Sequence, residues 1–260
     1  MGARAKIVLG LVVAALVVVG VVSGTHQKQR AVASGDEQAE EEGPPVRRDG
    51  FDQLFRDGQV VKVGGTKAAQ AKIEIVDAGP LELPTGKLVA GDPGTMEDTR
   101  EHDTFFAATV PPGKYPASLA MVRMVDDPAH RRVAAAKVTV RPDPVARWEM
   151  ALTPSQNPAT LKRNEIFGYG VDSGTGAFLD VSVLPALRGL NGDGHGPLVT
   201  AFDRDDTLHA SVRDPATGLN VIAFHSGWGD GFYGTWLGRT ADGAVAQFVT
   251  DFQVINSDQS

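Results

Sequence analysis

Two glycine-rich stretches hold the residues of this chain that are best suited to chemistry. The first, Phe167 to Asp180 (FGYGVDSGTGAFLD), places four glycines around Asp172 and ends in a second carboxylate, Asp180. The second, Ser226 to Gly238 (SGWGDGFYGTWLG), contains Asp230 and two of the three tryptophans of the chain. Glycines allow positive φ and close backbone approach. Carboxylates act as general acids and bases or as ligands of a divalent cation.

These residues lead to two functional hypotheses of different kinds. In the first, aromatic side chains beside the glycines form a binding platform, and the candidate binding residues are Trp228, Tyr233, Trp236 and Ser226. In the second, a hydrolase uses the three carboxylates, which requires Asp172 and Asp230 to lie within about 8 Å of each other in one cleft. A third possibility is a structural or interaction protein, because tight turns and packed corners need the same residue types.

Composition and motifs exclude several other classes of protein. A net charge of −7 argues against general nucleic-acid binding, and the absence of cysteine excludes disulfides and thiolate zinc sites. The chain has no phosphate loop, no H-E-x-x-H zinc helix and no G-x-S-x-G nucleophile elbow. Gly229 to Gly234 matches G-x-G-x-x-G, but the aromatic residues that follow favour a strand where a dinucleotide site needs a helix. The sequence therefore points to no particular cofactor or metal.

The elements that position these residues are expected to be short strands. Ten apolar or alternating runs predict short strands, and 30 glycines with 16 prolines supply the turns between them. Asp242-Gly243 is a hairpin signal between the last two strands. Helices are predicted only over Phe51 to Arg56 and Asp180 to Leu190, so the expected fold is mainly β: β-sandwich-like or β-rich α+β. The predicted strands are 72–77, 81–83, 87–90, 104–110, 115–125, 131–140, 147–152, 220–225, 232–237 and 244–254.

The amino-terminal region differs from the rest of the chain in residue composition. Ile7 to Val22 (IVLGLVVAALVVVGVV) is uncharged and follows Arg4 and Lys6, which predicts a membrane-spanning anchor or a cleaved signal peptide. We favour the anchor, with the domain outside the cytoplasm. The predicted organisation is an anchor or signal segment over 1–25, a flexible polar linker over 26–50 and one globular domain over 51–260. The corresponding partners are the membrane and an envelope glycan or protein, with no nucleic acid.

The glycine–acid motifs also carry a family resemblance. Gly170-Val171-Asp172-Ser173-Gly174-Thr175-Gly176 and Ser226-Gly227-Trp228-Gly229-Asp230-Gly231 are similar to two hallmarks of the bacterial domain-of-unknown-function 4241 family. Val110-Pro111-Pro112-Gly113 and the closing Asp251-Phe252 fit the same pattern. The resemblance covers most of Gly86 to Val254. It implies a bacterial origin and brings neither a known activity nor established site residues.

Overall fold

The computed structural model describes Arg47 and residues 49–64, 69–96, 104–162, 164–202 and 207–256. Strands make up 45% of the described residues and helices 13%, which confirms the mainly β class. The predicted span Ile7 to Val22 lies outside the described residues. Within them, no helix has the length and apolar character needed to cross a membrane.

The strands form two antiparallel sheets. Sheet A has the order β1-β2-β4-β5-β12-β11-β6, with β7 also paired to β11, and sheet B has the order β3-β8-β10-β9. Sheet A comprises β1 (Val60–Val63), β2 (Ala69–Leu83), β4 (Gly113–Met124), β5 (Arg131–Thr139), β6 (Arg147–Met150), β7 (Tyr169–Val171), β11 (Gly231–Arg239) and β12 (Val245–Asp251). Sheet B comprises β3 (Leu88–Gly91), β8 (Thr175–Asp180), β9 (His209–Arg213) and β10 (Asn220–His225).

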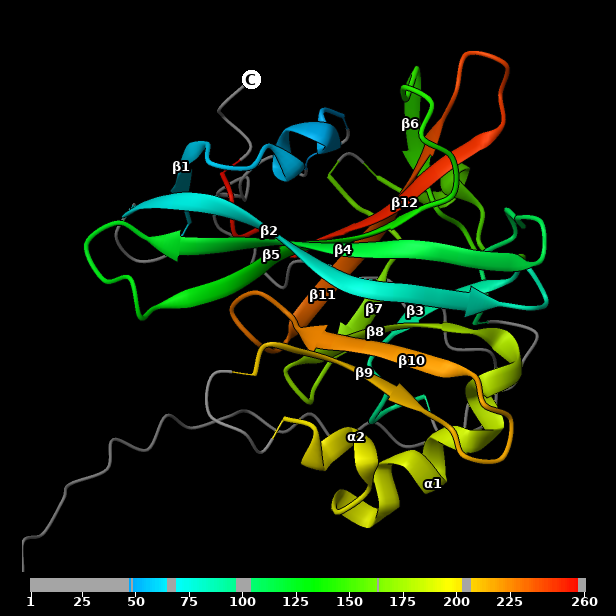
Figure 1. Cartoon of the computed structure of the whole chain (residues 1–260). Helices are drawn as coiled ribbons and strands as arrows, with labels where there is room; N and C mark the ends of the chain where they lie inside the picture. Colours follow the sequence, from blue (N-terminus) through cyan, green and yellow to red (C-terminus); the bar gives the residue numbers. More distant parts are fainter. Residues whose placement is uncertain are drawn as a thin grey trace, which may run out of the picture.

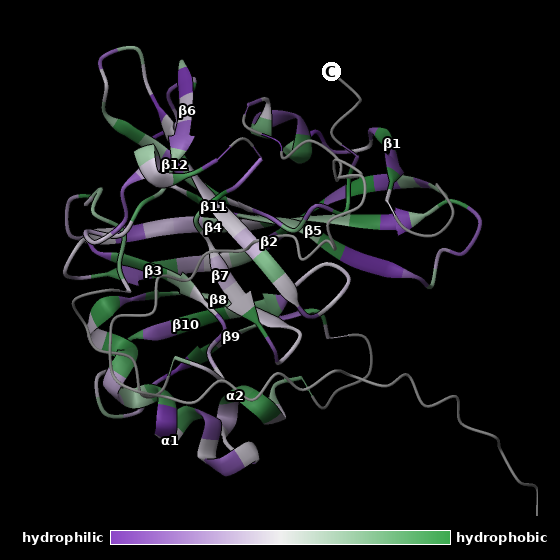
Figure 2. Cartoon of the chain, turned by 180° about the vertical axis from the view of Figure 1, so that it is seen from behind, coloured by the Kyte–Doolittle hydropathy of each residue, from purple (hydrophilic) through white to green (hydrophobic). Residues whose placement is uncertain are grey.

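Short helices cover the outer face of sheet B and one part of sheet A. Figure 1 shows sheet A above sheet B with the helices α1 and α2 below, and Figure 2 shows the same order from behind. The helical segments are η1 (Phe51–Phe55), η3 (Pro158–Thr160), η4 (Val181–Ala186), α1 (Leu187–Asn191), η5 (Gly192–Gly194) and α2 (Pro197–Thr200). Pro185 lies inside η4, where the tight helix lasts only six residues.

Sheet B is covered on both faces, which explains its sequence. Phe178, Ile222 and Phe224 belong to the core shared with sheet A, whereas Leu179 and Val221 pack against the helices. A strand that is buried on both faces becomes a continuous apolar run without alternation. The run Asn220 to His225 predicted β10 with its observed bounds for this reason.

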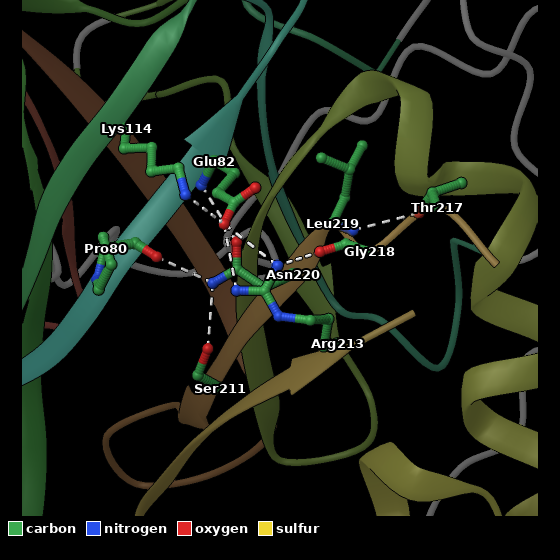
Figure 3. Close-up of polar contacts among 9 residues, drawn as sticks. All are labelled: Pro80, Glu82, Lys114, Ser211, Arg213, Thr217, Gly218, Leu219 and Asn220. Carbon is green, nitrogen blue, oxygen red and sulfur yellow. Dashed lines mark hydrogen bonds and ion pairs between the residues drawn. The ribbon is translucent and has the colours of Figure 1, made fainter. Parts of the chain in front are cut away.

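A polar network links β2 and β4 of sheet A to β9 and β10 of sheet B (Figure 3). Glu82 on β2 forms ion pairs with Lys114 on β4 and Arg213 on β9, with nitrogen–oxygen distances of 3.1 Å in each case. The backbone N–H of Glu82 donates to the side chain of Asn220 on β10, which in turn donates to the carbonyl of Pro80. Hydrogen bonds from Lys114 and Arg213 lower the pKa of Glu82. The network therefore fixes sheet B against β2.

Two expectations need adjustment. The predicted strand over 104–110 is wrong: this segment forms turns and bends, with a single bridge from Phe105 to Val89. The contacts of the domain also begin before Phe51, because the Arg47 guanidinium lies 3.3 Å from the buried carboxylate of Asp251. Arg47 also donates to the carbonyl of Asn256. The end of the predicted linker is thus attached to the end of β12.

Candidate functional site

The two glycine–acid segments, which are far apart in the sequence, lie side by side. β7 pairs with the start of β11, with Val171 opposite Gly231. The Ser226 N–H donates to the Gly174 carbonyl at 3.0 Å, and the Gly174 N–H donates to Oδ1 of Asp230 at 3.1 Å. We call this meeting of residues 170–175 and 226–231 the glycine junction.

A third segment, which sequence reasoning missed, holds the glycine junction in place. Asp92 is only 1% exposed and accepts four hydrogen bonds. Its Oδ2 accepts the N–H groups of Asp172 and Ser173 at 2.9 and 2.8 Å, and its Oδ1 accepts the Ser173 hydroxyl and the Gly94 N–H at 2.7 and 2.8 Å. The available signal was the run Asp92-Pro-Gly-Thr, which is typical of a turn capped by its own aspartate.

The three candidate carboxylates have different environments. Asp172 and Asp230 are exposed at the glycine junction. Asp180 is 0% exposed and lies at the far end of β8, where it accepts hydrogen bonds from Thr85 N and Oγ1 and from Ser182 N and Oγ at 2.6–3.0 Å. Asp180 lies five residues beyond Thr175, which places it about 17 Å from the glycine junction at the rise of an extended strand. The structure thus brings Asp172 and Asp230 into one region and uses Asp180 to cap η4.

Neither the glycine junction nor any other part of the described chain gathers three histidine or carboxylate side chains in a way that could hold a metal ion.

The side chains of Ser226 and Tyr233 stabilise the turn between β10 and β11. The Tyr233 hydroxyl donates to the carbonyls of Gly229 and Ser226 at 2.8 and 3.2 Å, and the Ser226 hydroxyl also donates to Gly229. Burial raises the pKa of Tyr233 to about 12, so this phenol stays protonated near neutral pH. Gly227 and Gly229, with φ of +57° and +114°, supply the backbone geometry that the turn needs.

The two tryptophans of the second segment do not form a common platform. Trp228 is 46% exposed on the turn, where the Arg132 guanidinium lies 5.6 Å from its ring and the His130 ring 6.1 Å away. Trp236 is 4% exposed and is the sixth residue of β11, about 17 Å along the strand from Gly231. Its ring stacks on Phe51 at 5.0 Å, and Phe51 in turn meets Trp148 on β6 edge-on at 4.9 Å.

Trp236 and Trp148 both line a large hollow beside β6, which we call the β6-edge hollow. Its volume is about 660 Å³. Two smaller cavities flank the glycine junction: one of about 220 Å³ includes Asp92 and Asp172, and one of about 440 Å³ includes Ser173 and His225. The lining of the β6-edge hollow comprises Ala107, Ala108, Trp148, Glu149, Met150, Leu152, Pro158, Leu161, Lys162, Trp236, Leu237 and Arg239.

Taken together, the fold and site define a two-sheet β domain with a helical layer and a carboxylate-braced glycine junction. A family described as a protein of unknown function (DUF4241) matches residues 81–250. This chain belongs to that family. No curated protein and no solved structure shows a significant match to this chain.

Proposed function

We propose that this protein is a membrane-tethered ligand- or partner-binding module of the cell envelope, and that its β6-edge hollow is the binding site. The observation that carries the proposal is that two of the three tryptophans, Trp148 and Trp236, line the same hollow. Its volume falls within the range of about 300–1,000 Å³ that is typical of ligand sites. Tryptophan is also enriched among the residues that dominate binding energies.

The chemistry of the lining supports binding of an amphipathic ligand. Aromatic and aliphatic side chains supply most of the lining, and Glu149, Lys162 and Arg239 supply charge. Arg239 Nε lies 2.5 Å from Glu149 Oε1, so this pair is already formed before any ligand arrives. A preformed pair costs little reorganisation when a ligand binds.

The location of the module follows from the amino-terminal segment. Ile7 to Val22 supplies sixteen residues without a charge, long enough with its uncharged neighbours to span a membrane. Residues 26–50 would then act as a tether, and the domain would meet its partner outside the cytoplasm. In membrane fractions, the full-length chain should resist extraction by high salt and carbonate. Release of a shorter soluble chain that begins near Thr25 or Ser34 would instead establish a secreted protein with a cleaved signal peptide.

The binding site is tested by comparing two tryptophan variants. Envelope glycans and peptides are screened for their effect on the thermal unfolding of the full-length chain, since a ligand at a hundred times its Kd adds about 2.7 kcal/mol to stability. Trp148→Ala should remove the stabilisation, whereas Trp228→Ala, on the distant turn, should keep it. Loss of stabilisation in Trp228→Ala alone would move the binding site to the turn between β10 and β11.

A second candidate function, a carboxylate- or metal-dependent hydrolase, is favoured by one observation. The hydrogen bond from Gly174 N to Asp230 keeps the acidic loops of Asp172 and Asp230 together. Asp180 was the third candidate, and its four hydrogen bonds at the start of η4 leave the dyad of Asp172 and Asp230 as the reacting pair. The test is turnover of chromogenic glycosides and phosphate esters with Mg²⁺ or Mn²⁺. Asp172→Asn should abolish turnover, with Asp193→Asn as the exposed control.

A further inference from the structure

The β6-edge hollow lies along the edge of a sheet. β6 is the terminal strand of sheet A and, within the described ranges, pairs only with β11, with Trp148 opposite Gly238 and Met150 opposite Trp236. The Ala151 N–H donates to the Thr235 carbonyl, so the neighbouring odd-numbered residue, Glu149, also faces β11. The backbone N–H and C=O groups of Trp148 and Met150 therefore point away from the sheet, and these backbone groups have no hydrogen-bond partner among the residues described.

The hollow also includes both faces of this edge. Successive side chains of a strand point to opposite faces, yet Trp148, Glu149 and Met150 all line the hollow. Trp148 and Met150 share one face with Trp236, and Glu149 shares the other with Leu237 and Arg239. The hollow thus follows the strand edge. An extended chain lying there would place alternate side chains against an aromatic face and a charged face.

The charged face has a basic excess, although the whole chain carries −7. Glu149 pairs with both Arg239 and Arg147, and Lys162 lines the same hollow, so this region holds three basic side chains for one acidic side chain in the lining. Lys162 is exposed and makes no ion pair within the described ranges, while Glu165 accepts the backbone N–H of Lys162 from outside the hollow. The unpaired positive charge favours acidic side chains in a ligand.

We propose that the β6-edge hollow binds an extended peptide with alternating acidic and apolar residues, which adds to sheet A as a strand beside β6. The main-chain groups of Trp148 and Met150 pair with the peptide backbone, its apolar side chains contact Trp148 and Trp236, and its acidic side chains contact Lys162 and Arg239. This inference rests on the proposed binding function and specifies the ligand class for the same site.

The probe is a fluorescein-labelled hexapeptide, acetyl-Glu-Val-Glu-Val-Glu-Val-amide, titrated with the full-length chain and followed by fluorescence anisotropy. We expect saturable binding that weakens with salt, and binding at least tenfold weaker for the Lys-Val counterpart. Lys162→Glu should weaken binding about three- to tenfold, as expected for loss and reversal of an exposed ion pair. Lys62→Glu, an exposed lysine on the opposite edge strand β1, is the matched control and should leave binding unchanged.

Backbone pairing is tested on the peptide itself. Two further probes carry N-methyl groups on the valine amides or on the glutamate amides, and only one of them should lose binding, because alternate residues of an added strand face β6. Equal binding by both, or equal binding by the Lys-Val peptide, would overturn the proposal, as would an absence of binding at millimolar concentration. If another ligand then shows Trp148-dependent stabilisation, the proposed binding function stands and only the peptide inference is lost.

Discussion

Replacing Asp92 by asparagine should destabilise the domain and loosen the glycine junction. The carboxylate receives hydrogen bonds from three backbone N–H groups and one hydroxyl, two on each oxygen. An asparagine keeps one oxygen for the N–H groups of Asp172 and Ser173 and places an NH₂ group at the other position. The Ser173 hydroxyl can rotate and accept from this NH₂ group, but the Gly94 N–H loses its acceptor. Hydrogen bonds to a charged group contribute about 1.5–3 kcal/mol each, so the loss of one, with the loss of charge at the others, costs about 2–4 kcal/mol. That is a large fraction of the stability of about 5–15 kcal/mol of a typical domain.

The assay is equilibrium unfolding in urea, analysed by linear extrapolation. Asp214→Asn is the matched control, because Asp214 also accepts three hydrogen bonds, but from Ala216 and Thr217 within its own turn. Asp92 joins segments that are 80 residues apart, and its variant should therefore cost more and should speed amide exchange over residues 170–175. An Asp92→Asn variant within about 1 kcal/mol of the parent, with the same m-value, would show that the carboxylate does not brace the glycine junction.

Three further predictions concern packing, pH and the amino-terminal boundary. Gly168→Ala should destabilise by about 1–3 kcal/mol, because its Cβ would lie 2.2 Å from the Tyr233 carbonyl oxygen, whereas Gly170→Ala, with no atom within 4 Å of the new carbon, should be near neutral in the same urea assay. Burial lowers the pKa of His225 below its usual value of 6.5. As the pH falls through 6.5, His225 is protonated in the unfolded chain before it is protonated in the folded chain, so the free energy of unfolding should decrease between pH 7.5 and 5.5. His225→Gln should reduce this fall, and an unchanged pH dependence would contradict the reasoning. A chain that begins at Pro45 should be soluble and should unfold cooperatively. A chain that begins at Asp49 should be less stable, because the buried carboxylate of Asp251 loses its ion pair with Arg47. Aggregation of both chains would contradict this prediction.

The sequence predicted those strands whose apolar pattern reflects burial within the sheets. The bounds of β10 were predicted correctly, and Asp242-Gly243 identified the hairpin between β11 and β12, with φ of +84° at Gly243. β7 and β8 were missed because their glycines are typical of loops. They are strands because β7 pairs with β11 and β8 pairs with β10. The segment 104–110 has strand-like residues but forms only a single bridge to β3, and its apolar side chains Phe106 and Val110 fill the core from a loop.

The candidate site was predictable in part for a related reason. Residue types identified both glycine–acid segments, but the pairing of β7 with β11 that joins them depends on contacts some sixty residues apart. Asp92 was missed because its partners are backbone N–H groups, which any residue supplies. Trp148 was missed because its importance comes from its position on β6 opposite Gly238 of β11, where no side chain keeps the tryptophan ring away.

The environments of the acidic residues favour binding at the β6 edge over chemistry at the glycine junction. A catalytic carboxylate needs free oxygens directed at a substrate, yet Asp92 and Asp180 each accept four hydrogen bonds and Asp230 accepts the Gly174 N–H. Asp92 and Asp230 stabilise the loops of the glycine junction, and Asp180 stabilises the start of η4 at the other end of β8. The β6 edge has the opposite character, because Trp148 and Met150 have backbone groups without partners and Lys162 has a charge without a partner in the described chain. Natural proteins usually cover or shorten an exposed strand edge, because it pairs readily with another chain. A four-residue edge strand with a charged face limits such pairing to peptides of matching charge and alternation, which is the selectivity that a binding module requires.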